Sequence, residues 1–365
     1  MKKYLIYPIL ASISTLLIAC GGGSSSTSST STPTTQFGYI PNAGSNTVSM
    51  YGINNTTGVL TPLSTATVAT EKNPQMLAIN PASTFAYVPN FTSNSVSMYS
   101  ISSATGMLTP LTTPTIVTGT NPNSITINPA GTFAYVSNEG SDNILMYAIG
   151  SNGILTLSGA PVVAGLDPQG PIINAAGTYA YVVNNSILSS TVSMFAVNST
   201  TGVLTPLATP TVATGTSPQT LTINPAGTFA YVPNQSDNTV SIYRIGSNGI
   251  LTSLGTASTG SEPVGIAINP AGTFAYVTNN AGNTVSMYAI NSTTGMLTSL
   301  APSTVAAGGA PGGITINAAG TLAYVANYGG NSVSMFTIGS NGVLTASGTA
   351  VPTQNNPTIL TIAPR

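Results

Sequence analysis

One short pattern, repeated along the chain, constrains the fold more than any other feature of the sequence. The tetrapeptide Tyr-(Val/Ile)-x-Asn occurs seven times, with its tyrosine at positions 39, 87, 135, 181, 231, 276 and 324. Neighbouring copies are 45 to 50 residues apart, a period within the range of β-propeller blades. The chain is therefore expected to build one structural unit seven times.

Each repeat contains four short apolar segments of β-strand length. In the fifth repeat the first three are 220–223, 229–232 and 240–243, and a Ser-Asn-Gly turn introduces the fourth. Asn224–Gly227 has proline and glycine where a type I turn favours them. The strands are apolar or small on both faces and show no helical periodicity, which is typical of sheets packed between neighbouring sheets.

The two ends of the repeat region complement each other. The first copy, at Tyr39, has no first strand before it, whereas 357–363 reads as a first strand with nothing after it. The C-terminal strand is therefore expected to complete the blade whose other three strands come from 37–66. The sequence predicts an all-β, seven-bladed β-propeller with four-stranded blades, closed into a ring by this exchange.

The N-terminus has the pattern of an export signal. Lys2 and Lys3 precede an apolar stretch from Tyr4 to Ala19, and the only cysteine of the chain, Cys20, follows. Leu-Ile-Ala-Cys resembles the lipobox at which bacterial lipoproteins are cleaved and lipidated; an ordinary secretory signal is the alternative.

Three segments follow from this interpretation. They are a signal peptide at 1–19, a lipidated Cys20 with a flexible Gly/Ser/Thr linker to residue 36, and the propeller at 37–365. The expected location is the cell envelope, with the lipid anchor in the membrane. Glycine rather than aspartate follows Cys20, which favours the outer membrane.

Composition excludes several kinds of function. Only 3% of the 365 residues are charged, and there is no histidine and one cysteine. A His-ligated zinc site, a Ser-His-Asp triad and an internal disulfide are therefore excluded. Five basic residues cannot form the positive surface that nucleic-acid binding requires, so no nucleic-acid partner is expected.

The repeated motif carries a family resemblance. Tyr276-Val277-Thr278-Asn279 resembles the YVTN repeat of β-propellers, a family that overlaps the lactonase-type seven-bladed propellers, including bacterial 6-phosphogluconolactonases. The resemblance implies the propeller fold over 37–365. Lactonase-type relatives use His, Arg and Glu in the central channel. This chain has no histidine, and Arg244 is the only arginine within its blades, at the end of a third strand. We therefore assign no catalytic residue.

The acidic residues all fall in two classes of loop that open on the same face of a propeller. Three lie between one blade and the next, and three lie between second and third strands: Glu71, Asp167 and Glu262, and Glu139, Asp142 and Asp237, respectively. One interpretation is an acidic top face that binds a cation, with Ca²⁺ as a weak candidate cofactor, or a cationic partner. Within it, Glu139, Asp142 and Asp167 form the best trio. The alternative is that long, hydrated loops tolerate charge.

Two further features allow two interpretations each. The asparagines that end the seven tetrapeptides form either a ring of amides at the channel entrance or a set of structural strand-end caps. The fourth repeat has a longer loop that carries Ile187 and Leu188, which either contact a partner or pack locally.

The sequence favours a non-enzymatic binding or interaction scaffold, because the first strands carry no ionisable groups to line the channel. We expect a lipid-anchored monomer that binds a protein or glycan partner through its top loops. One alternative is a lactonase-like hydrolase that uses acidic residues, with or without a metal, in place of the missing histidine. A structural surface-coat component is another.

Overall fold

The computed structural model describes residues 36–187 and 190–364. The signal peptide, Cys20, most of the linker and Leu188 lie outside the described residues. Gln36 was assigned to the linker, but it is the first residue of β1 (Gln36–Asn42), so the folded region begins one residue earlier than expected. Within the described ranges, no helix is long and apolar enough to cross a membrane.

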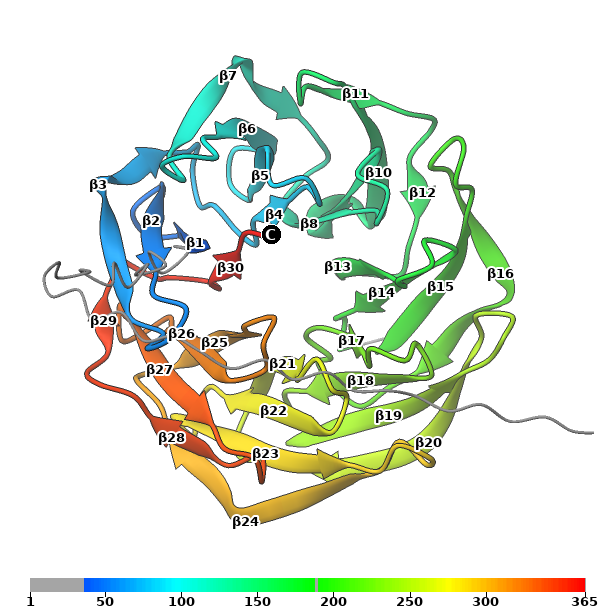
Figure 1. The fold of residues 1–365 in the computed structure, drawn as a ribbon. Helices are drawn as coiled ribbons and strands as arrows, with labels where there is room; N and C mark the ends of the chain where they lie inside the picture. Colours follow the sequence, from blue (N-terminus) through cyan, green and yellow to red (C-terminus); the bar gives the residue numbers. More distant parts are fainter. Residues whose placement is uncertain (1–35, 188–189, 365) are drawn as a thin grey trace, which may run out of the picture. The chain divides into compact units, whose positions relative to one another are not determined.

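Seven antiparallel sheets stand around a central channel like the blades of a propeller (Figure 1). The innermost strands are β30 (Thr361–Ile362), β4 (Ala78–Ile79), β8 (Pro122–Ile127), β13 (Pro168–Ile173), β17 (Thr222–Ile223), β21 (Pro263–Ile268) and β25 (Pro311–Ile316). The second strands are β1, β5 (Phe85–Asn90), β9 (Phe133–Asn138), β14 (Tyr179–Asn184), β18 (Phe229–Asn234), β22 (Phe274–Asn279) and β26 (Leu322–Asn327).

The third strands are β2 (Thr47–Ile53), β6 (Ser95–Ile101), β10 (Asn143–Ile149), β15 (Thr191–Val197), β19 (Thr239–Ile245), β23 (Thr284–Ile290) and β27 (Ser332–Ile338). The outer strands are β3 (Leu60–Ala69), β7 (Leu108–Val117), β16 (Leu204–Ala213), β20 (Leu251–Ser258) and β24 (Leu297–Ala306). In the third and seventh blades the outer strand is split, into β11 (Leu155–Leu157) and β12 (Val162–Val163), and into β28 (Leu344–Ala346) and β29 (Val351–Pro352). The single-turn 3-10 helix η1 (Glu139–Ser141) follows β9.

The ring closes as the sequence predicts. β30 pairs with β1 through Gly38 opposite Ile362 and Tyr39 opposite Thr361. The C-terminal strand therefore completes the sheet that the N-terminal strands begin, in the order β3-β2-β1-β30. Because a closed ring has no terminal blade, no repeat is left with an uncovered face.

The split outer strands have a local cause. The third blade has Ser158-Gly159 where most blades continue their outer strand, and Gly159 adopts a φ of +79°. Gly348 occupies the same place in the seventh blade, with a φ of +73°. A left-handed residue interrupts the extended backbone, and glycine adopts it without steric cost.

The core consists of seven apolar clusters, each between two neighbouring blades. The tetrapeptide tyrosine is almost wholly buried in every blade, and in five blades its hydroxyl donates to a backbone carbonyl of the next blade. Tyr231, for example, donates to the Gly295 carbonyl oxygen at 2.8 Å. The repeated tyrosine thus both fills the space between blades and fixes their relative height.

We expect Tyr231→Phe to lower the free energy of unfolding by about 1 kcal/mol, because it leaves the buried Gly295 carbonyl without its donor. Tyr135→Phe is the matched control, since the buried Tyr135 hydroxyl has no hydrogen-bond partner among the described residues. Its loss is expected to be neutral or slightly stabilising. Urea titration of both variants measures the difference. Equal losses would show that the bond between the blades contributes nothing.

Alkaline pH is expected to destabilise the propeller. Burial raises the pKa of Tyr135, Tyr231 and Tyr276 to about 12, whereas an unfolded tyrosine titrates near 10. Full stability is therefore present below pH 10 and is lost as the pH rises toward 12, where the unfolded chain has released these protons and the folded chain has not. Urea midpoints measured from pH 8 to pH 12 test this, and a flat profile would contradict it.

Candidate functional site

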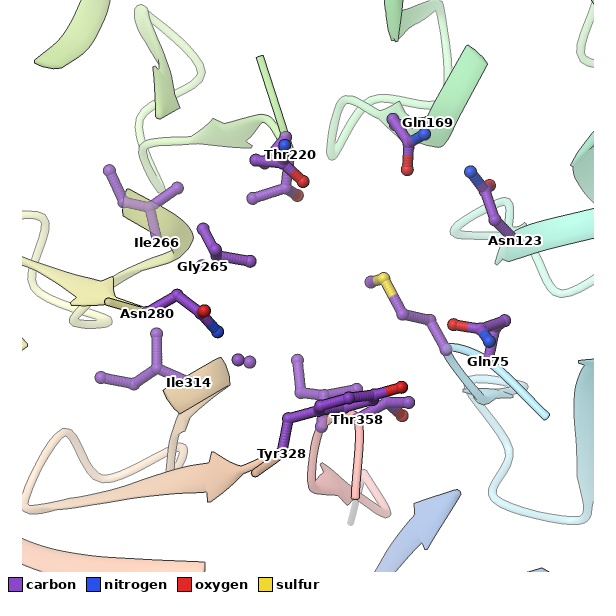
Figure 2. A pocket seen from close by; sticks show the side chains of 16 residues that line it. Gln75, Asn123, Gln169, Thr220, Gly265, Ile266, Asn280, Ile314, Tyr328 and Thr358 are labelled. Atoms are coloured by element: carbon purple, nitrogen blue, oxygen red, sulfur yellow. The ribbon is translucent and has the colours of Figure 1, made fainter. Parts of the chain in front are cut away.

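A cavity of about 280 Å³ lies in the central channel (Figure 2). Its wall includes the residue that follows the first-strand proline of each blade. In chain order these residues are Gln75, Asn123, Gln169, Gln219, Val264, Gly312 and Thr358. Each of the seven blades therefore contributes one residue to the wall of the same cavity, and in the seventh blade this residue, Gly312, has no side chain.

A constant register places these residues. Each first-strand proline lies opposite the buried tetrapeptide asparagine of its own blade, as Pro168 lies opposite Asn184 and Pro263 opposite Asn279. In the first, second and fifth blades the same pairs form isolated bridges. The residue after the proline consequently takes an equivalent position in every blade.

Amide side chains gather on one side of the cavity wall. Four consecutive blades, the second to the fifth, contribute amide side chains, and the next three contribute Val264, Gly312 and Thr358. Ile266 and Ile314 extend the apolar side, and Tyr328 lies at its edge (Figure 2). Asn280 adds one amide on this second side. A ligand in the cavity would therefore meet an amide-rich side and a mostly apolar side.

One carboxylate is held against the amide side. Oε2 of Glu139 accepts hydrogen bonds from Nδ2 of Asn123 and from Nε2 of Gln169, each at 3.3 Å. Ser137 donates its hydroxyl to Oδ1 of Asn123 at 2.7 Å, which fixes the orientation of that amide. Glu139 is half-buried at the start of η1. The structure thus places a negative charge beside polar groups that line the cavity.

Two other predicted site residues join loops on the top face. Oδ1 of Asp142 accepts the backbone N–H of Asp167 at 2.9 Å, as Oδ1 of Asn283 accepts that of Ala310 in the sixth blade. Oδ2 of Asp237 accepts the backbone N–H of Thr216 at 2.7 Å. These carboxylates do in their blades what asparagine and serine do in others.

The remaining predicted acids have separate surroundings. Asp167 and Glu262 occupy the left-handed position before the first-strand proline, with φ values of 51° and 54°. Oε2 of Glu262 accepts from Nε2 of Gln235 at 3.4 Å, and Glu71 is exposed.

The best predicted trio is not brought together as a metal site. Within residues 36–187 and 190–364, no three Asp, Glu, Cys or His side chains converge as metal ligands. The binding of Ca²⁺ or of a cationic partner stays a prediction.

The seven tetrapeptide asparagines do not line the channel entrance. All are fully buried, and in six blades Nδ2 donates to hydroxyl groups of the third strand, as Asn279 does to Ser286 at 2.9 Å. The structural interpretation of these residues is therefore confirmed, although their partners are hydroxyls of the third strand rather than the backbone of the following loop.

Ile187, in the longer loop of the fourth blade, is 76% exposed. Its side chain is therefore not packed locally, and a partner contact there stays a prediction.

Sequence reasoning missed the amides that line the cavity. Gln75, Asn123, Gln169 and Gln219 look like ordinary polar spacers within the first strands. The signal was present, because each follows a proline that recurs in every repeat.

The fold and its channel define the class of protein: a seven-bladed β-propeller with a cavity in its central channel that amide and apolar side chains line. The chain belongs to the family described as Lactonase, 7-bladed beta-propeller, whose model matches residues 27–218 and 208–311. No protein of curated function matches the sequence.

Several solved structures share the fold. A candidate 6-phosphogluconolactonase from Bacteroides fragilis has a TM-score of 0.80 at 22% identity and covers 91% of this chain and 99% of its own. A second candidate 6-phosphogluconolactonase, from Bacteroides uniformis, has a TM-score of 0.78 at 18% identity, covering 90% and 99%. The periplasmic gluconolactonase of Pseudomonas aeruginosa has a TM-score of 0.77 at 18% identity, also covering 90% and 99%.

These findings correct the main functional prediction. The interpretation as a non-enzymatic scaffold is wrong, because the chain belongs to the lactonase family and proteins named as gluconolactonases share its fold. The alternative, a lactonase-like hydrolase, has the better support. The error came from looking for ionisable groups on the first strands, whereas Glu139 approaches the channel from a loop.

Substitutions at Asp142 test the role of this side chain in joining the loops. Asp142→Asn is expected to leave stability unchanged, because asparagine keeps the acceptor and tolerates the φ of 52°. Asp142→Ala is expected to cost about 2 kcal/mol, through the lost hydrogen bond and the left-handed backbone. Asn283→Ala is the control and should cost the same. Thermal melts with and without Ca²⁺ are the measurement. A Ca²⁺-dependent rise in Tm that Asp142→Asn abolishes would contradict the purely structural role.

Proposed function

We propose that the propeller is a lactonase-like hydrolase that opens a lactone ring in the channel cavity, with Glu139 as the general base. The observation that carries the proposal is the Glu139 carboxylate, held at 3.3 Å by two amides that themselves line the cavity. Membership of the lactonase family and the gluconolactonase names of proteins with the same fold support it.

The chemistry needs a base and a donor for a developing oxyanion. A water molecule attacks the lactone carbonyl carbon while Glu139 takes a proton from it. The hydroxyl of Thr220, which also lines the cavity, donates to the carbonyl oxygen and stabilises its negative charge. The bond from the carbonyl carbon to the ring oxygen then breaks, and the proton passes from Glu139 to that oxygen. The product is the open hydroxy acid, and Glu139 is an anion again.

The absence of histidine does not oppose this mechanism. A carboxylate can serve as a general base when it is positioned within reach of the attacking water. Hydrogen bonds from Asn123 and Gln169 fix Glu139, and no element of the proposed reaction needs a second titrating group.

An envelope location fits the proposal. The N-terminal pattern predicts export and a lipid anchor at Cys20, and a gluconolactonase with the same fold is periplasmic. We therefore propose that the hydrolase acts on lactones outside the cytoplasm while tethered to the outer membrane.

Glu139→Gln tests the general base. We expect kcat for glucono-1,5-lactone to fall by about 100-fold or more, because the amide cannot accept the proton from water. Glu71→Gln is the matched control, since Glu71 is an exposed acid of the same face, whereas the Glu139 carboxylate accepts hydrogen bonds from two amides that line the cavity. Stopped-flow detection of acid release, corrected for spontaneous hydrolysis, gives the rates, and unchanged thermal melts show that both variants fold. An unchanged rate in Glu139→Gln, or no catalysis by the wild-type protein, would refute the proposal.

A further inference from the structure

The cavity wall contains no cation. None of its lining residues is Lys or Arg, and the part of the chain that the structure describes holds two basic side chains, Lys72 and Arg244. Arg244 is exposed, with its guanidinium carbon 5.2 Å from the centre of the Phe229 ring, on a third strand. Lys72 is exposed in the loop before β4, and its backbone N–H is bound to the Ser93 hydroxyl at 3.0 Å.

We propose that the site selects an uncharged, polyhydroxylated lactone and rejects its phosphorylated counterpart. The inference rests on the proposed function and names the substrate class of the same site. It sets this chain apart from what the name 6-phosphogluconolactonase describes.

Electrostatics supplies the first argument. A phosphate monoester carries a charge between −1.5 and −2 near neutral pH and is normally bound by Arg, Lys or clustered backbone N–H groups. In this cavity it would meet side-chain amides and the Glu139 carboxylate instead. Removing the phosphate from water next to a like charge, without a cation, is strongly unfavourable.

The amide wall supplies the second argument. An amide side chain has donors on nitrogen and an acceptor on oxygen, which matches a hydroxyl group, itself both donor and acceptor. Gln75, Asn123, Gln169 and Gln219 line the cavity, and their side-chain nitrogens already donate to protein acceptors. The Oε1 atoms of Gln75, Gln169 and Gln219 therefore remain as acceptors for ligand hydroxyls, and these acceptors would repel a phosphate. A row of hydroxyls along a sugar-like ring is the ligand that can use them together.

The opposite wall supplies the third argument. Gly265 and Gly312 leave room between the side chains of this wall, and packing requires glycine at position 265, because a Cβ there would lie 2.7 Å from the Gly312 carbonyl oxygen. At its edge, Tyr328 is 43% exposed. Two hydrogen bonds fix the backbone of Tyr328. Its N–H donates to the Ala310 carbonyl oxygen at 3.0 Å, and its carbonyl oxygen accepts from Nδ2 of Asn356 at 3.1 Å. The exposed ring that projects from this fixed backbone can cover the C–H face of a small cyclic polyol.

The first experiment compares two substrates on the wild-type protein. We expect kcat/KM for glucono-1,5-lactone to exceed that for 6-phosphoglucono-1,5-lactone by about 100-fold, equivalent to roughly 2.7 kcal/mol. Calorimetric titration with the stable glucono-1,5-lactam and its 6-phosphate provides a readout that needs no turnover. Preferential binding of the neutral lactam without hydrolysis of either lactone would refute the proposed function and keep the inference. Equal or tighter binding of the phosphorylated lactam would overturn the inference.

Two arginine variants test the electrostatic argument. Gln75→Arg introduces a cation into the cavity wall without touching Glu139, and we expect it to raise kcat/KM for the phosphorylated lactone by about tenfold. Gln354→Arg adds the same charge at an exposed position that does not line the cavity, and should change neither substrate. Gains of equal size in both variants would show that net charge, and not the cavity wall, sets the preference.

Two further variants test the remaining side chains. Tyr328→Ala is expected to raise KM for the neutral lactone about tenfold while Tyr328→Phe leaves it near the wild-type value, because the ring and not the hydroxyl makes the contact. Lys72→Gln is expected to change neither substrate. Efficient hydrolysis of the phosphorylated lactone that Lys72→Gln removes would overturn the inference and assign phosphate binding to that lysine.

Discussion

The pairing of each first-strand proline with a buried asparagine is the constraint on which the rest of the structure depends. The asparagine is buried, so its side-chain N–H donors require partners within the protein, and in six blades hydroxyls of the third strand accept from Nδ2. This requirement fixes the second strand against the third, and the bridge to the proline fixes the first strand against the second. The residue after the proline is thereby held at the channel, whatever its identity.

The packing of the blades also explains why the chain has few charged residues. Both faces of every blade are covered by neighbours, which leaves little surface for ionised groups. Where carboxylates occur in the top loops, Asp142 and Asp237 accept backbone N–H groups as asparagine and serine do in other blades. Glu139 differs, because its hydrogen-bond donors are side-chain amides that line the cavity. Glu139 therefore places a negative charge beside the channel cavity, in a molecule that leaves little surface for ionised groups.

The sequence predicts the fold well and the site poorly, for physical reasons. Seven copies of one motif determine the number of blades. The innermost strand of the first blade comes from the C-terminus instead of preceding Tyr39, and this determines how the ring closes. Both features can be predicted because they depend on chain order alone. The site depends on where individual side chains point. Gln169 gives no sign in the sequence that it meets Glu139, which is 30 residues away. The functional prediction failed because ionisable groups were sought on the first strands alone, whereas the carboxylate bonded to the cavity wall, Glu139, lies in η1 after β9.

Under the proposed function, the asymmetry of the channel would let a repeated scaffold bind one substrate in one orientation. A ring of seven identical amides would offer a cyclic ligand equivalent poses, and no single carbonyl would be presented to a base. Val264, Gly312 and Thr358 break that equivalence on one side, and Glu139 breaks it on the other. One repeated motif is therefore enough to build a rigid scaffold. The few positions at which the repeats differ determine the chemistry of the channel. In a propeller of this kind, the residue after each first-strand proline is the place to look for specificity.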